Sequence, residues 1–294
     1  MKRPTTMEEL LGSLKGFATR EGVELGLAFE PRSTDILISP YAKCGTTWVQ
    51  QIVHSLRTRG AMDFDEITAV TPWLEMSHDM GIDPSAQQYV PRAYKSHLSW
   101  DLIPKGGRYI CVLRDPKDAL VSMYKFFEGW FFQPGSISIN KFARDFYMRK
   151  QDPDGYWYHL VSWWQVREQS AVLVLCYEDM KDNLAANVKK IAAQMSIELD
   201  AELEAIVLEH SSLEFMRRHS DQFDDHLIRQ TRDAACGLPP GGVSNKVNRG
   251  QVGSYARALE PQLIAELDET WGQRVYPYIG IESYSALRLE LQNL

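Results

Sequence analysis

The sequence has few cysteines, and none of them follows a spacing that cysteine-based sites use. Its 294 residues include four cysteines, and no two of them form a CxxC pair. The usual structural zinc motifs are therefore excluded. Scattered single cysteines also argue against a disulfide scaffold, so we expect a protein of a reducing compartment.

Long apolar segments are missing as well. The longest notable apolar run, residues 171–177, has seven residues, whereas a membrane-spanning helix needs about 20. The N-terminal residues 1–10 contain acidic side chains and no apolar core of a secretory signal. We therefore expect a soluble, cytoplasmic protein without a membrane span.

The sequence also lacks an excess of positive charge. The formal net charge is −7, which disfavours a general binder of nucleic acids or anionic membranes. It does not exclude a local basic pocket. What the chain does contain is ordinary globular composition, 44% hydrophobic and 24% charged, without repeats or low-complexity stretches.

Three short apolar runs are typical of buried strands, at residues 35–39, 109–113 and 171–176. Each is continuous rather than alternating, which indicates strands that are covered on both faces. Helical periodicity follows each run, for example at residues 49–56. The alternation predicts an α/β fold with a central, mostly parallel sheet flanked by helices.

Residues 218–247 have a different character. They are polar, contain Pro239-Pro240-Gly241-Gly242 and show weak periodicity, which predicts a long functional loop that covers a substrate or cofactor. No boundary between domains is evident elsewhere. We therefore predict one domain over residues 1–294.

The first strand leads into a candidate anion-binding turn, residues 40–48. A strand, a tight turn and a helix N-terminus present free backbone N–H groups to a negative ligand, and Gly45 allows a close approach. Lys43, Thr46 and Thr47 add donors. A Walker A loop would carry its lysine after the second glycine, whereas Lys43 precedes the single glycine, so the pattern opposes a kinase.

Two further groups follow other strands. Arg114 ends the second run, and Ser122 lies two turns into the next helix, so both can face one crevice and bind a terminal phosphate. Arg114 could instead pair with Asp115 or Asp118. His97 lies beside Lys95 at an expected strand end and is a candidate general base.

These segments together are similar to the motifs of one family. Residues 39–48, SPYAKCGTTW, resemble TYPKSGTTW; residues 95–98, KSHL, resemble KTHLP. Residues 109–126 resemble YVxRNPKDxxVSxYxF, 177–180 match YEDM, and 248–255 are similar to RKGxxGDW. The motifs occur in the family's order, so the chain resembles the cytosolic sulfotransferases. These enzymes move a sulfuryl group from 3′-phosphoadenosine 5′-phosphosulfate (PAPS) to an alcohol, phenol or amine and release 3′-phosphoadenosine 5′-phosphate (PAP).

The resemblance implies a P-loop-NTPase-like sulfotransferase fold, PAPS as donor substrate and no metal. It also implies that His97 is the general base, that Lys43 assists the leaving phosphate, and that Lys95 stabilises the sulfuryl group. The implied donor-binding residues are Lys43, Cys44, Gly45, Thr46, Thr47, Trp48, Arg114, Ser122, Tyr177, Ser211, Leu213, Asn248, Arg249 and Gly250. Cys44, Asn248 and Leu213 depart from the family pattern.

The acceptor is predicted to be a small hydrophobic molecule. Trp73, Phe126, Phe127 and Trp130 are candidates for the walls of its pocket, because apolar walls with one catalytic polar group suit a hydrophobic alcohol or phenol. The alternatives are a P-loop kinase and a non-catalytic PAP-binding protein. Neither a nucleic-acid partner nor a membrane span is expected, and both monomer and homodimer stay open.

Overall fold

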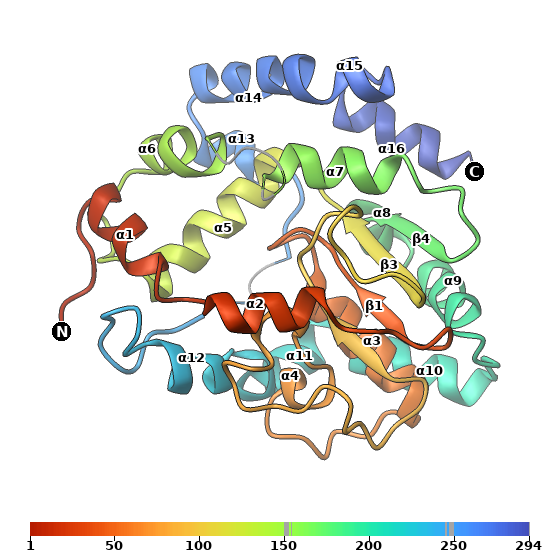
Figure 1. Cartoon of the computed structure of the whole chain (residues 1–294). Coiled ribbons are helices and arrows are strands. Elements are labelled where there is room, and N and C mark those ends of the chain that lie inside the picture. Colours follow the sequence, from red (N-terminus) through yellow and green to blue (C-terminus); the bar gives the residue numbers. More distant parts are fainter. Residues whose placement is uncertain (150–152, 154, 245, 247–249, 294) are drawn as a thin grey trace.

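A parallel sheet of four strands forms the centre of the computed structural model (Figure 1). The structure describes residues 1–149, 153, 155–244, 246 and 250–293. The strand order is β2-β1-β3-β4, and Ile36 of β1 pairs with Ala93 on one side and Arg108 on the other. The strands are β1 (Ile36–Ile38), β2 (Ala93–Lys95), β3 (Arg108–Leu113) and β4 (Val172–Cys176).

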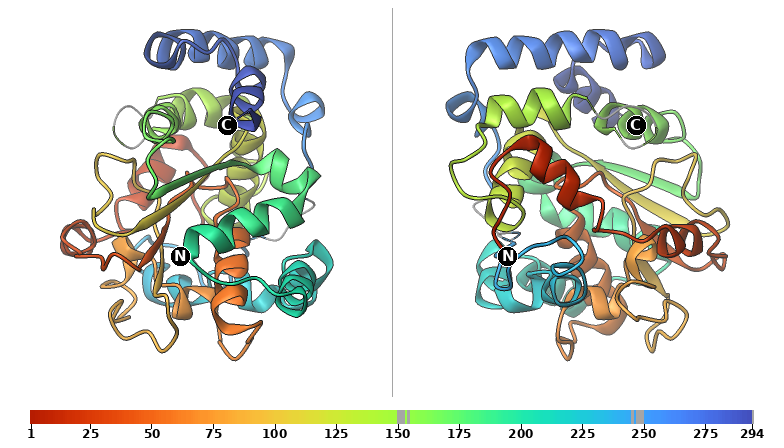
Figure 2. Two further views of the ribbon diagram at one scale, coloured as in Figure 1. Left: turned by 90° about the vertical axis from the view of Figure 1, so that its right-hand side faces the viewer. Right: turned by 60° about the vertical axis from the view of Figure 1, so that its left-hand side comes forward.

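Helices cover both faces of this sheet, which explains why its strands are continuously apolar. Ile36 and Ile110 point to the face that packs on α3 (Thr46–Thr58), α9 (Leu184–Met195) and α10 (Ala201–His210). Leu37 and Tyr109 point to the opposite face, where Figures 1 and 2 show α7 (Tyr156–Trp164) and α14 (Pro261–Arg274). The predicted α/β fold with a parallel sheet is therefore confirmed.

The helix after β3 begins at residues that favour a helix start. α5 (Pro116–Trp130) has Pro116 in its first turn, and the Asp115 side chain accepts a hydrogen bond from the backbone N–H of Lys117. Proline is favoured there because it lacks a donor, and aspartate is a preferred cap.

The remaining helices are α1 (Met7–Leu14), α2 (Arg20–Leu27), α4 (Ile67–Val70), α6 (Ile139–Phe142), α8 (Tyr177–Asp182), α11 (Leu213–Arg218), α12 (His226–Arg232), α13 (Tyr255–Ala258), α15 (Tyr276–Ile279) and α16 (Tyr284–Gln292), with the short helical turns η1 (Leu74–Met76), η2 (Ala143–Tyr147) and η3 (Ser220–Phe223).

The prediction of a long irregular loop over residues 218–247 was wrong in its first half. That half holds η3 and α12. The helices are short, and they bury only Phe223 and Ile228, so the sequence has too few apolar positions to display a helical period. Residues 245 and 247 of the expected loop lie outside the described residues.

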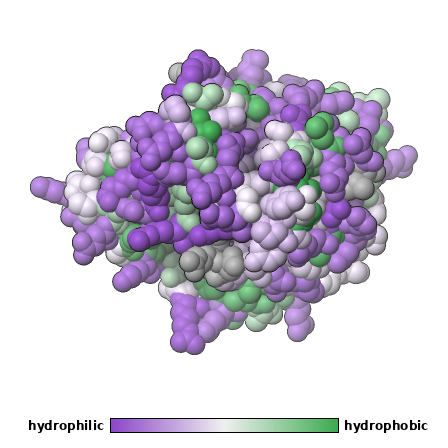
Figure 3. Space-filling model, turned by 90° about the horizontal axis from the view of Figure 1, so that it is seen from above, coloured by the Kyte–Doolittle hydropathy of each residue, from purple (hydrophilic) through white to green (hydrophobic). Residues whose placement is uncertain are grey.

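The face of the molecule seen from above is largely polar. Seen from above, most of the visible residues are hydrophilic, with separate small hydrophobic patches (Figure 3). In the part of the chain that the structure describes, no helix is both long and apolar enough to cross a membrane.

Close packing of α2 on η1 gives the first testable prediction. A Cβ atom at Gly26 would lie 2.8 Å from Cα of Glu75 and 2.8 Å from the carbonyl oxygen of Leu74, whereas a Cβ at Gly12 in α1 would meet no atom within 4 Å. We expect Gly26→Ala to lower the free energy of unfolding by about 1–3 kcal/mol through overpacking. The matched Gly12→Ala should be neutral or stabilising by about 0.5–1 kcal/mol. Urea unfolding at pH 7 measures both, and equal effects would contradict the packing argument.

Candidate active site

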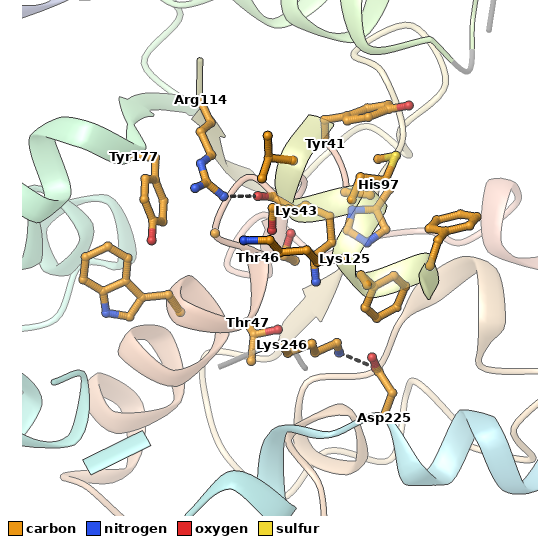
Figure 4. Close-up of a pocket in the computed structure, with 18 of the residues that line it drawn as sticks. Tyr41, Lys43, Thr46, Thr47, His97, Arg114, Lys125, Tyr177, Asp225 and Lys246 are labelled. Atoms are coloured by element: carbon orange, nitrogen blue, oxygen red, sulfur yellow. Dashed lines mark hydrogen bonds and ion pairs between the residues drawn. The ribbon is translucent and has the colours of Figure 1, made fainter. Parts of the chain in front are cut away.

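The main cavity lies at the carboxyl ends of the strands, where parallel sheets bind ligands. It has a volume of about 1030 Å³. Each strand is followed by a residue of its wall: Lys43 after β1, His97 after β2, Arg114 after β3 and Tyr177 after β4 (Figure 4).

Most of the predicted site residues line this cavity together. They are Lys43, Gly45, Thr46, Thr47, Trp48, Trp73, Lys95, His97, Arg114, Ser122, Phe126, Phe127, Trp130, Tyr177, Ser211, Leu213 and Gly250. Cys44 is fully buried, and burial raises the pKa of its thiol to about 12, so only its backbone can serve a ligand. Asn248 and Arg249 lie outside the described residues.

The turn before α3 has the geometry of an anion site. Lys43 has φ +71° and Gly45 has φ +99°, and these left-handed conformations turn the chain sharply from β1 into the helix. No side chain caps the N-terminus of α3, which begins after Gly45. The first backbone N–H groups of this helix are therefore available to a ligand. The buried hydroxyl of Thr46 likewise has no hydrogen-bond partner among the described residues.

Two lysines lie against aromatic rings in the cavity. Nζ of Lys43 is 4.1 Å from the ring centroid of Phe126, and Nζ of Lys95 is 3.7 Å from that of Trp73. Burial, followed by the charge of Lys246, lowers the pKa of each lysine to about 7. A negative ligand between them would reverse this shift, because it favours the charged form of both amines.

His97 is held in one tautomer. Its Nδ1 lies 2.8 Å from the carbonyl oxygen of Pro40, which can only accept, so Nδ1 carries the proton and Nε2 keeps a lone pair. The ring packs edge-on against Trp73 at 5.1 Å between centroids. Burial, followed by the charge of Lys95, lowers the pKa of His97 well below its usual value. The imidazole is therefore neutral at pH 7 and able to accept a proton.

Glu75 supports this histidine and was missed at the level of the sequence. Its Oε1 accepts the backbone N–H of His97 at 2.9 Å and the hydroxyl of Ser96 at 3.1 Å. Glu75 is buried, and burial raises its pKa. The only signal in the sequence was a single carboxylate inside the otherwise weakly polar segment 71–76.

Arg114 lies between the anion-binding turn and two aromatic residues. Its Nη1 donates to the carbonyl oxygen of Lys43 at 2.9 Å, and its guanidinium lies 4.3 Å from the ring centroid of Tyr177. Tyr177 in turn packs edge-on against Trp48, so the predicted adenine contacts are neighbours. The two carboxylates considered as alternative partners of Arg114 bond elsewhere: Asp115 accepts from the backbone N–H of Lys117 at 2.8 Å, and Asp118 accepts from that of Gly253 at 2.6 Å.

The apolar side of the cavity includes the N-terminal residues Leu11, Leu14 and Phe17 in addition to the predicted aromatic residues. The ring centroid of Phe17 lies 6.0 Å from that of Trp73 and 5.9 Å from that of Trp130. The sequence held no signal for this contact, because it depends on how the N-terminal segment packs against elements far along the chain.

These observations define an α/β protein with an anion-binding turn and an adjoining apolar pocket at the carboxyl edge of a parallel sheet. The chain belongs to the sulfotransferase family, because the family model described as "Sulfotransferase domain" matches residues 33–278. This confirms the resemblance drawn from the sequence motifs.

The relatives agree with that assignment. Over 271 residues the chain is 32% identical to "Sulfotransferase 1E1" of Mus musculus, covering 87% of each protein. It is 28% identical to "Sulfotransferase 1C2" of Rattus norvegicus over 94% of each. The fold is similar to that of mouse sulfotransferase SULT7A1 complexed with PAP, with a TM-score of 0.69, 18% identity and 94% of each chain covered. It is also similar to retinol dehydratase in a complex with retinol and PAP, with a TM-score of 0.70, 17% identity, and 93% of this chain and 96% of the other covered.

Proposed function

We propose that the protein transfers the sulfuryl group of PAPS to a hydroxyl or amine of a small hydrophobic acceptor. The observation that carries this proposal is the meeting, in one cavity, of a neutral His97 with two lysines, the buried Lys95 and the half-buried Lys43, and a free helix N-terminus. Two similar structures were determined with PAP, which supports PAPS as the donor.

The donor would lie across the anion-binding turn. Lys43 and the first N–H groups of α3 would bind the 5′-phosphosulfate, since a helix N-terminus favours phosphate groups. Arg114 and Ser122 would bind the 3′-phosphate, and a guanidinium suits two oxygens of one phosphate. The adenine would lie near Trp48 and Tyr177, with Ser211, Leu213 and Gly250 adjoining, and Asn248 and Arg249 are proposed to complete this part of the site.

The chain's own residues would then perform the transfer. Nε2 of His97 takes the proton of the acceptor hydroxyl as its oxygen attacks sulfur in line with the breaking bond to the 5′-phosphate. Lys95 stabilises the sulfuryl oxygens, and Lys43 stabilises the charge that develops on the leaving phosphate. Positioning and charge stabilisation are the main contributions in transfers of this loose kind.

The acceptor is proposed to be a hydrophobic alcohol or phenol. Trp73, Phe126, Phe127 and Trp130 form an apolar wall beside His97, as small apolar ligands require. Retinol, which is in complex with one of the similar proteins, is an alcohol of this kind. The helices of residues 218–247 are proposed to cover the bound ligands, and residues 1–294 to act as one domain.

A turnover assay tests the function. It uses labelled PAPS with a panel of phenols, alcohols and amines, in the presence and absence of EDTA. We expect transfer to at least one phenol or alcohol at the same rate with EDTA. Strict dependence on a metal, or tighter binding of ATP than of PAP, would favour the kinase. Binding of PAP without transfer to any acceptor would favour a non-catalytic binding protein.

A variant of Arg114 tests the orientation of the donor. Arg114→Met should weaken the binding of PAP by roughly 10–100-fold through loss of charge-assisted hydrogen bonds, while binding of AMP, which lacks the 3′-phosphate, should change much less. Arg108 is a matched control because it lies at the other end of the same strand and bonds to the carbonyl oxygen of Gln194. Calorimetric titration measures each affinity, and equal losses for PAP and AMP would contradict the assignment.

A further inference from the structure

A buried ion pair in the cavity has no part in the function proposed above. Nζ of Lys246 contacts Oδ1 of Asp225, and their side chains are 8% and 4% exposed. Both residues line the same cavity as Lys43 and His97, and Figure 4 shows the pair beside Thr47. Asp225 belongs to the segment between η3 and α12, and its φ of +61° is left-handed.

The pair shares the cavity with both lysines of the proposed mechanism, Lys43 and Lys95. Lys246 contributes the largest charge effect on the pKa of both Lys43 and Lys95 and lowers each, while Asp225 raises both. Glu66 also faces this cluster, but burial raises its pKa, and its Oε1 is occupied by Thr68. Asp225 is therefore the carboxylate that pairs with Lys246 in the cavity that Lys43 and Lys95 also line.

Stability alone does not account for such a pair. Removing two charges from water is costly, and replacing a buried ion pair with apolar residues of similar volume is often neutral or stabilising. A lysine amine has three donors on a flexible stem, so Lys246 can keep one hydrogen bond to Asp225 and offer another to an anion bound in the cavity.

We propose that Lys246 is a donor-binding residue that contacts the sulfuryl oxygens of PAPS, and that Asp225 is the positioning residue that holds its amine in the cavity. This inference rests on the proposed function, since it assigns a further cation to the same donor. Lys246 recognises the group that distinguishes PAPS from PAP, because it lines the same cavity as Lys95, to which the sulfuryl oxygens are assigned above.

The test compares PAPS with PAP. Lys246→Met should weaken the binding of PAPS, measured by calorimetry without acceptor, by roughly 10–100-fold, and should lower kcat/KM for PAPS by a similar factor. Binding of PAP should change by less than about threefold, since PAP lacks the sulfuryl oxygens. Lys246→Arg should restore part of the PAPS affinity, because it keeps the charge. Equal losses for PAPS and PAP would reduce Lys246 to a structural residue and overturn the inference.

The positioning role of Asp225 is tested by a single variant and by a double variant with Lys246. Asp225→Asn should lower kcat with little change in PAP affinity, because Lys246 keeps its charge but loses its anchor. The double variant Asp225→Asn, Lys246→Met should retain the unfolding midpoint of the wild type and lose activity no further than Lys246→Met alone. Additive losses would overturn the coupling of the two residues. If the wild type transfers sulfuryl normally and Lys246→Met matches it, only this inference fails; if the wild type neither binds PAP nor transfers, the proposed function fails with it.

Discussion

Replacing His97 by alanine should lower kcat by about 10²–10⁴-fold, the range typical of general acid–base catalysis. The reason is geometric. The Pro40 carbonyl fixes the proton on Nδ1, so Nε2 is the lone pair beside the acceptor pocket, and alanine has no group that can replace it. Steady-state turnover of labelled PAPS with the best phenol or alcohol of the panel measures the loss.

Two controls separate this chemical role from a structural one. PAP should bind His97→Ala with nearly unchanged affinity, because the predicted donor contacts lie in turns and helices that follow other strands. Alanine at His78, a partly exposed histidine near Glu21, should leave kcat unchanged. A His97→Ala variant that loses PAP binding in parallel with kcat would mean that His97 only supports the loop at Pro40.

The pH dependence of kcat/KM is a second test of His97 as the general base. Because burial and then the charge of Lys95 lower the pKa of His97, its base form persists below the usual histidine range. We therefore expect no fall in kcat/KM of the wild type as pH decreases through about 6.5, the ordinary histidine pKa. A decrease centred there would indicate a base with an unshifted histidine pKa.

The sequence predicted those parts of the site that depend on local structure. The turn from Lys43 to Thr47 follows a continuous apolar strand and starts a helix, so its anion-binding geometry is encoded within a few residues. His97 and Arg114 end strands of the same parallel sheet, and parallel strands bring their carboxyl ends together. These residues therefore meet wherever that sheet forms.

The residues that the sequence did not reveal depend on contacts between distant segments. Glu75 supports His97 from a turn 22 residues earlier, and Phe17 reaches Trp130 from the N-terminal segment. Lys246 meets Asp225 across α12 and the turns that follow it. No period or spacing within a segment records such pairings, because each is set by tertiary packing.

Replacing Lys43 by methionine should lower kcat by about 10²–10³-fold, which is the loss typical of removing one group that stabilises charge in the transition state. Methionine keeps most of the side-chain volume against Phe126, so the loss reports the charge. Lys189→Met is a matched surface control, since Lys189 pairs with Glu204 away from the cavity, and its kcat should equal that of the wild type. An equal effect of both variants would remove Lys43 from the mechanism.

The same lysine makes donor binding depend on pH. The pKa of Lys43 and of Lys95 is about 7 in the unliganded cavity, and an anionic ligand raises both values because it stabilises the charged amines. The complex then binds more protons than the free protein, so PAP affinity should fall as pH rises from about 7 to about 9, where the free lysines become neutral. Lys43→Met removes one of the two lysines that take up a proton when PAP binds. Its affinity for PAP, measured by calorimetry across that range, should be lower at neutral pH and decline less steeply. A slope equal to that of the wild type would mean that Lys43 does not contact the 5′-phosphate.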